Sequence, residues 1–208
     1  MMLRRGIFIL LLALPLAAEP LDRIAVTIGK HVIAESDILR DLRCAAFIDD
    51  QAVDVSGAAK KKSAERLVDQ YLLLEDAAVT RAPLPGAEAA DALLAPIRGR
   101  YSSNTAFEAA LEYAQISEAE LRQHLITGLR LLRYSESRFR PDSQFTDEDL
   151  RAFYSKFAAG KPGAPDFETS RAQLQQLLTN QRASEALDKW LETARDEADI
   201  VYRDAVFS

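Results

Sequence analysis

The chain has 208 residues, of which 32 are acidic and 26 are basic, and its formal net charge is −6. Nucleic acid and anionic lipid repel an acidic chain, so we exclude both as the main binding partners. Cys44 is the only cysteine, which rules out an internal disulfide bond. Its place among apolar residues of a helical segment predicts a buried thiol, with a mixed disulfide to a partner protein as the alternative.

The N-terminus has the features of a targeting signal. Arg4 and Arg5 precede a short apolar run, residues 6–14, and small residues follow it. The run is far shorter than the roughly 20 apolar residues that a membrane-spanning helix needs. We therefore expect a signal peptide over residues 1–18, cleaved after Ala18, and no stable membrane insertion after cleavage. The alternative is that the uncleaved segment anchors the protein in the membrane.

A small β-hairpin is expected directly after this segment. Residues 24–28 and 31–33 are rich in β-branched side chains, and Gly29 begins the tight turn between them. Residues 199–203 also have strand character, and we expect them to pair with residues 24–28. This pairing would join the two ends of the chain.

Helices are predicted along most of the remaining chain, where apolar residues recur with a period near 3.6. The expected ranges are about 37–47, 57–80, 87–101, 105–113, 118–138 and 167–198, with a shorter helix after Thr146. Leu121, Leu125, Leu129 and Leu132 form the expected buried stripe of the helix that ends at about residue 138. The sequence therefore predicts a mainly α-helical fold with a small β-sheet that joins the N- and C-terminal ends.

Polar residues mark the starts of several of these helices. Ser36 is the predicted N-cap of the first helix, and Ser117 with Glu120 forms a capping box. Thr146 and Asp149 repeat the capping-box arrangement with a shorter acid. The last helix carries an apolar stripe around Trp190, which needs a surface to bury against, so we expect it to pack on the N-terminal helices.

Several segments, taken in order, resemble the SurA-like periplasmic chaperones. They are residues 22–37, 66–77, 107–122, 145–154 and 185–202, all of which follow the expected signal peptide in the sequence. Ile28 departs from the family pattern, which usually has Asn before the hairpin glycine. In that family a parvulin prolyl-isomerase domain commonly follows the fourth of these segments. Here only a Gly/Pro-rich linker, residues 158–166, stands at that point.

The resemblance implies one SurA N-terminal-like domain over residues 19–208 that lacks the isomerase domain. It also implies a periplasmic, ATP-independent chaperone that binds unfolded or extended polypeptides of the envelope or outer membrane. It implies no enzymatic activity. The alternatives are a prolyl-isomerase-family protein that acts as a non-catalytic adaptor of an envelope complex, and an isomerase with a degenerate domain.

Aromatic side chains are the candidates for peptide binding, because they give contact area at a small entropic cost. The candidates are Phe107, Tyr113, Tyr134, Phe139, Phe153 and Phe157. For each of them, packing in the core is the alternative, since large apolar side chains lie mostly inside proteins.

No catalytic residue, metal site or cofactor is predicted. His31 and His124 are far apart in sequence and lack companions at ligand spacing, so we expect surface or capping roles for both. Basic side chains gather at residues 60–62 and again at Arg130, Arg133, Arg138 and Arg140. Solvated helix faces are the simplest interpretation, and docking to acidic groups of a client or partner is the alternative.

Overall fold

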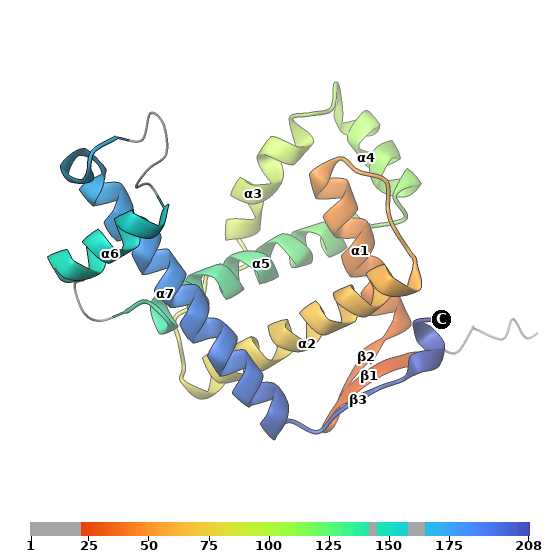
Figure 1. Cartoon of the computed structure of the whole chain (residues 1–208). Coiled ribbons are helices and arrows are strands. Elements are labelled where there is room, and N and C mark those ends of the chain that lie inside the picture. Colours follow the sequence, from red (N-terminus) through yellow and green to blue (C-terminus); the bar gives the residue numbers. More distant parts are fainter. Residues whose placement is uncertain (1–21, 142–144, 158–164) are drawn as a thin grey trace, which may run out of the picture.

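The computed structural model describes residues 22–141, 145–157 and 165–208. The expected signal peptide and most of the predicted linker lie outside these ranges. The elements are β1 (Ile24–Ile28), β2 (His31–Ala34), α1 (Glu35–Asp49), α2 (Gly57–Val79), α3 (Ala89–Arg98), α4 (Asn104–Tyr113), α5 (Glu118–Arg138), α6 (Asp147–Phe157), α7 (Phe167–Glu197) and β3 (Ile200–Tyr202), then a 3₁₀ turn at Asp204–Val206 (Figure 1). The predicted class, mainly helical with one small sheet, is confirmed.

The sheet joins the two ends of the chain. Its strand order is β2-β1-β3, and both pairings are antiparallel. Gly29 in the hairpin turn has a φ of 55°, a left-handed conformation that glycine adopts without steric cost. Ile28 lies opposite Ile200 and Val26 lies opposite Tyr202, so the predicted pairing of the terminal strand with residues 24–28 is confirmed.

Helix α1 begins earlier than predicted, and the prediction that Ser36 is its N-cap is wrong. The cap residue is Ala34, whose backbone N–H donates to the Asp37 carboxylate at 3.0 Å. Ser36 lies inside the first turn, where its backbone N–H donates to Asp22 at 3.2 Å and its hydroxyl donates to the same carboxylate. The partner of Ser36 precedes β1, so no local capping rule could identify it.

The other predicted caps are confirmed. Glu120 accepts the backbone N–H of Ser117 at 2.7 Å, while the Ser117 hydroxyl accepts the N–H of Glu120 at 3.2 Å. Thr146 and Asp149 exchange the same bonds at 2.9 and 3.2 Å. These contacts satisfy N–H groups that the first turn of a helix leaves without a partner.

The predicted leucine stripe of α5 is wrong at its far end. Leu121 is buried, but Leu132 is 54% exposed, and Ile126 and Tyr134 are the other buried residues of this helix. Helix α5 packs against α3, α1, α2 and α7 in different places. Its buried side therefore changes along its length and does not follow one line of leucines.

Two apolar clusters lie within the body of the molecule, which consists of the sheet and α1–α5, and a third lies where α2 and α5 meet α7. One packs the inner face of the sheet on α1 and α2, with Val26, Ile38 and Val68 almost fully buried. The other surrounds Phe107 and includes Cys44 from α1.

The C-terminal half of α7 is fastened to this body. Trp190 joins a cluster with Leu73 of α2, and its ring centroid lies 5.8 Å from that of Phe139. Arg195 donates to both carboxylate oxygens of Asp69 on α2, at 2.7 and 2.5 Å. The predicted packing of the last helix on the N-terminal helices is confirmed.

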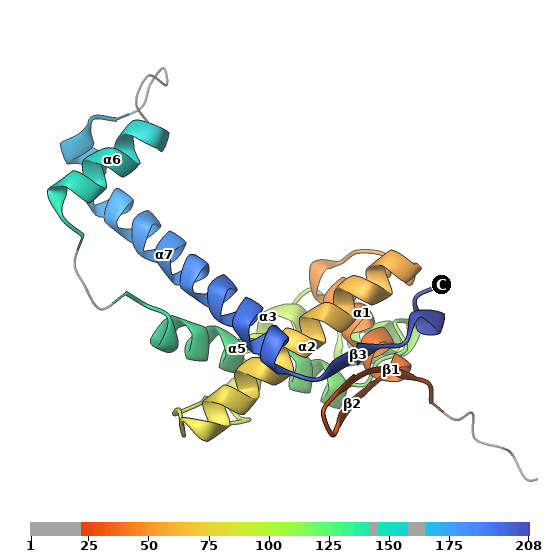
Figure 2. The same cartoon turned by 60° about the horizontal axis from the view of Figure 1, so that its bottom comes forward.

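The other end of α7 forms a separate helical hairpin with α6, which we call the arm (Asp147–Phe157 and residues 167–178). It projects away from the sheet and from α1–α4 (Figure 2). Its own apolar cluster consists of Leu150, Phe153, Phe167, Leu174 and Leu178.

In the parts of the chain that the structure describes, every helix is too short or too polar to cross a membrane.

Candidate functional site

The six aromatic candidates lie in different environments. Phe107, Tyr134, Phe139 and Phe153 are between 0% and 8% exposed, so they belong to the core and present little surface to a peptide. Tyr113, at the end of α4, is 93% exposed. The side chain of Phe157 lies outside the described part of the chain. Of the described candidates, Tyr113 is therefore the one that can contact a peptide without a change in the fold.

Tyr113 borders a groove of about 480 Å³ at the ends of α1 and α4, which we call the α1–α4 groove. It is lined by Arg43, Ala46, Phe47, Asp50, Gln51, Ala52, Val53, Tyr101, Ala110, Tyr113, Ala114 and Gln115. Helix α1 ends at its rim, because Asp50 adopts a left-handed φ of 52°. Gln115, which follows α4, also has a left-handed backbone conformation, with a φ of 56°.

A fixed aromatic layer lines the α1–α4 groove. The rings of Phe47 and Tyr101 are stacked, with centroids 6.0 Å apart and planes inclined by 10°. Both rings contact buried Phe107, at centroid distances of 6.2 and 5.5 Å. Because Phe107 fixes these two rings in place, they offer apolar contact area and lose little side-chain entropy on binding.

The loop after α1 adds further apolar surface. Val53 is 44% exposed and Val55 is 47% exposed, although this loop reads as polar in the sequence. Two valines at alternate positions of a polar loop are the sequence signal that could have identified this apolar surface. Contiguous exposed apolar surface rimmed by polar groups is typical of interaction sites.

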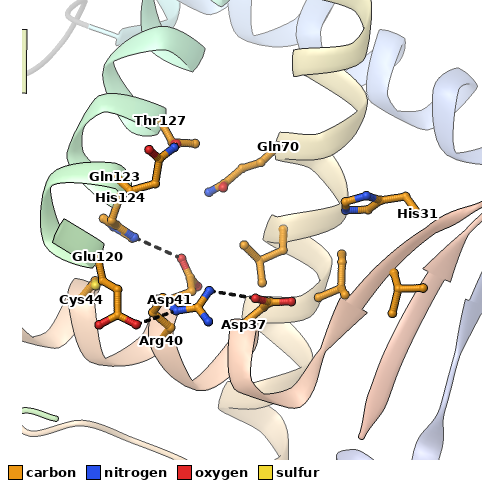
Figure 3. A pocket seen from close by; sticks show the side chains of 13 residues that line it. His31, Asp37, Arg40, Asp41, Cys44, Gln70, Glu120, Gln123, His124 and Thr127 are labelled. Carbon is orange, nitrogen blue, oxygen red and sulfur yellow. Dashed lines mark hydrogen bonds and ion pairs between the residues drawn. The ribbon is translucent and has the colours of Figure 1, made fainter. Parts of the chain in front are cut away.

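A second cavity, the β2 pocket, lies between β2, α1, α2 and α5 and has a volume of about 290 Å³ (Figure 3). It is lined by His31, Val32, Ile33, Asp37, Arg40, Asp41, Cys44, Leu67, Gln70, Glu120, Gln123, His124 and Thr127. At one side Arg40 bridges two carboxylates, donating to Asp37 at 2.8 Å and to Glu120 at 3.0 Å. This bridge joins α1 to the start of α5.

A buried carboxylate lies deeper in the β2 pocket. The side chain of Asp41 is 4% exposed, and its Oδ2 accepts the Ser63 hydroxyl at 2.5 Å and the Arg66 guanidinium. Its Oδ1 faces His124, whose Nδ1 is 3.6 Å away. Burial lowers the pKa of His124, Asp41 opposes this change and Arg66 adds to it, so the net effect favours the neutral imidazole.

The two histidines, far apart in sequence, line the same pocket. His31 is exposed and stacks on Tyr71 at a centroid distance of 4.0 Å, which fits the expected surface role. His124 is half-buried and faces Asp41, so the expected surface or capping role is wrong for this residue. Within the described ranges, no three side chains of the metal-ligating types are close enough to hold an ion.

The predicted burial of Cys44 is confirmed, since the residue is 0% exposed. Burial raises the pKa of its thiol to about 11, and the nearby carboxylates of Glu120 and Asp41 add to this effect. A thiol that is protonated and covered at neutral pH reacts slowly with disulfides. Its role is therefore packing, which argues against the mixed-disulfide alternative.

Most members of the basic clusters are engaged within the molecule. Lys60 lies 2.8 Å from Glu35 and is only 16% exposed, so it is not part of a solvated face. Arg130 donates to the Pro85 carbonyl at 2.9 Å. Arg133 pairs with Glu136 at 3.0 Å and Arg138 with Asp76 at 3.5 Å. These contacts engage four of the seven basic side chains and reduce the positive charge that is available to an acidic partner.

Neither a scan of protein-family models nor a search of curated proteins finds a match to this chain.

Proposed function

We propose that this protein is an ATP-independent periplasmic chaperone that binds unfolded envelope or outer-membrane proteins and has no isomerase activity. The α1–α4 groove is the observation that carries the proposal. It combines a stacked aromatic layer with Tyr113, which is 93% exposed at its border. The periplasmic location is supported by the signal-like N-terminus and by the resemblance of the sequence to SurA-like chaperones.

The groove suits weak binding of many different chains. Its apolar wall attracts aromatic and aliphatic side chains in proportion to the area that they bury, whatever their sequence. The polar side chains of Arg43, Asp50 and Gln115, which also line the groove, keep the surface around this wall hydrated. A client that buries only a few side chains here dissociates readily, so release needs no nucleotide hydrolysis.

The test is an aggregation assay. A denatured outer-membrane protein is diluted into buffer with the purified chain, and light scattering is followed. The wild-type protein is expected to suppress scattering at stoichiometric amounts. Tyr113→Ser is expected to raise the amount needed for half-suppression about fivefold, as for loss of one interface anchor.

Val79→Ser is the matched control, since Val79 is 80% exposed on α2 and does not line the groove. It is expected to behave like the wild type. The proposal fails if the wild-type chain leaves scattering unchanged, or if both variants lose protection equally. Recovery of one stoichiometric partner from an envelope extract, with no spread of clients, would favour the adaptor alternative.

A further inference from the structure

The β2 strand has one free edge. It lies at the end of the sheet order β2-β1-β3, and no strand of the described ranges pairs with its outer side. Ile28 and His31 flank the hairpin turn as a directly opposed pair, so they exchange both hydrogen bonds. The next pair, Thr27 and Val32, is then of the type that does not hydrogen-bond. The backbone N–H and C=O of Val32 therefore point to the free edge.

The bonds between β1 and β3 support this assignment. Gly29 donates to the Asp199 carbonyl at 2.9 Å, and Arg203 donates to the Ala25 carbonyl at 2.8 Å. Alternate residues of β1 therefore bond to β3, and Thr27 is the residue between these two positions. Its backbone groups face β3, which leaves those of Val32 without a partner in β1.

This free edge borders the β2 pocket. His31, Val32 and Ile33 form one wall of the pocket, and Gln70 on α2 points into the space between α2 and α5 (Figure 3). Within the described residues, the Gln70 amide makes no hydrogen bond. Gln123 on the opposite wall donates to Thr127 at 3.2 Å and keeps its carbonyl oxygen available. Amide groups at this position match the donors and acceptors of an extended main chain.

The pocket also has an excess of negative charge. Asp37, Asp41 and Glu120 line it, whereas Arg40 is the one permanently charged base among its lining residues. Arg66 pairs with Asp41 from outside the lining, and one negative charge still remains uncompensated. His124 does not change this balance, because burial lowers its pKa. A cationic side chain is therefore favoured in the pocket over a neutral or an acidic one.

We propose that an extended polypeptide segment adds to the free edge of β2 as a further strand and places a lysine side chain in the β2 pocket. Addition to a sheet edge supplies main-chain hydrogen bonds, and the neighbouring pocket selects the side chain. The cavity of about 290 Å³ is large enough for one such side chain, and the carboxylates of Asp41 and Glu120 are among its lining groups. The occupant belongs to the class of the proposed function, on which this inference rests, but the surface differs from the α1–α4 groove.

The test is fluorescence anisotropy with a short peptide of alternating valine and threonine, a central lysine and a rhodamine label. Val32→Pro removes the edge N–H and preserves the β1–β2 bonds, because proline is tolerated on an edge strand. Val32→Ala keeps this N–H and is the matched control. Val32→Pro is expected to weaken binding about tenfold relative to Val32→Ala. Equal affinities of the two variants would overturn the proposal.

A second measurement does not depend on a variant. Hydrogen exchange of the Val32 amide in the wild-type protein is expected to slow when the peptide is added, and unchanged exchange would contradict strand addition. A peptide with norleucine in place of lysine is expected to bind several-fold more weakly. Equal binding of the two peptides would show that the charge of the pocket does not select the lysine side chain.

These outcomes are separable from those of the proposed function. If Val32→Pro binds the peptide as well as Val32→Ala and the chain still prevents aggregation, the chaperone proposal stands and the edge site fails. If the chain does not prevent aggregation but the peptide slows exchange at Val32, the edge site stands and the chaperone proposal fails.

Discussion

The body and the arm are held together in different ways. The body is held together by contacts between distant parts of the chain, such as the β1–β3 pairing, and the Arg195–Asp69 ion pair attaches the C-terminal half of α7 to it. The arm depends on one helix pair and a small apolar cluster around Phe153. Few long-range contacts mean a low free energy of local opening. The arm is therefore expected to open while the body stays folded.

Phe107→Ala is expected to have the largest effect, because it removes a fully buried ring from the body. Loss of such a ring costs about 4 kcal/mol, from lost transfer energy and the cavity left behind. Thermal unfolding should shift down by about 10 °C for a chain of this size. A calorimetric midpoint within a degree or two of the wild type would show that this cluster does not limit the stability of the body.

Phe153→Ala is the corresponding change in the arm. It should cost about 3 kcal/mol of local stability, and the loss should appear only in the arm. Hydrogen exchange is expected to speed up in α6 and in residues 167–178, with unchanged rates in β1 and α2. Equal acceleration in both regions would mean that the arm and the body unfold as one unit.

The pH dependence of stability should arise in the body and involve His124. The pKa of this group is below its ordinary value of 6.5 in the folded state, since it is buried between Asp41, which favours its protonation, and Arg66, which opposes it. The unfolded state then binds the proton more tightly, so the stability present above pH 6.5 decreases as pH falls towards the folded pKa.

Urea unfolding at a series of pH values measures this effect. His124→Gln should flatten the pH dependence between about pH 7 and 5, because the titrating group is removed. The local stability of the arm, followed by hydrogen exchange, should not change with this substitution. A variant that keeps the full pH dependence would assign it to another group.

The smallest effect is expected from Arg195→Gln, at the junction of α7 with the body. Arg195 is 46% exposed and Asp69 is 22% exposed, so solvent screens the pair. The loss should be about 0.5–1 kcal/mol, measured by urea unfolding, and should decrease at high salt. A larger loss that does not respond to salt would indicate that packing of the arginine stem dominates.

The sequence predicts best what is decided locally. The Ser117–Glu120 box was predictable because both partners lie within one helical turn. The pairing of residues 199–203 with the hairpin was predictable as well, because the sequence offers this segment no other strand outside the hairpin. Ser36 was assigned wrongly because its partner, Asp22, precedes the hairpin and lies 14 residues away in the sequence.

The candidate sites were less predictable, because burial is decided by which elements meet. Tyr113 and Phe107 are both aromatic residues of α4, yet one is 93% exposed and the other is fully buried. The β2 pocket could not be predicted either. It exists because α5 brings His124 beside Asp41 of α1, and no spacing in the sequence reveals that meeting.

The position of β1 between β2 and β3 has a consequence for the order of assembly. A chain that emerges from the ribosome N-terminus first can form the β1–β2 hairpin early, but β1 has no partner on its other side until residues 200–202 emerge. A two-stranded hairpin alone is only marginally stable in water. The sheet is therefore completed last, and the protein reaches its folded state only after the C-terminal strand has emerged.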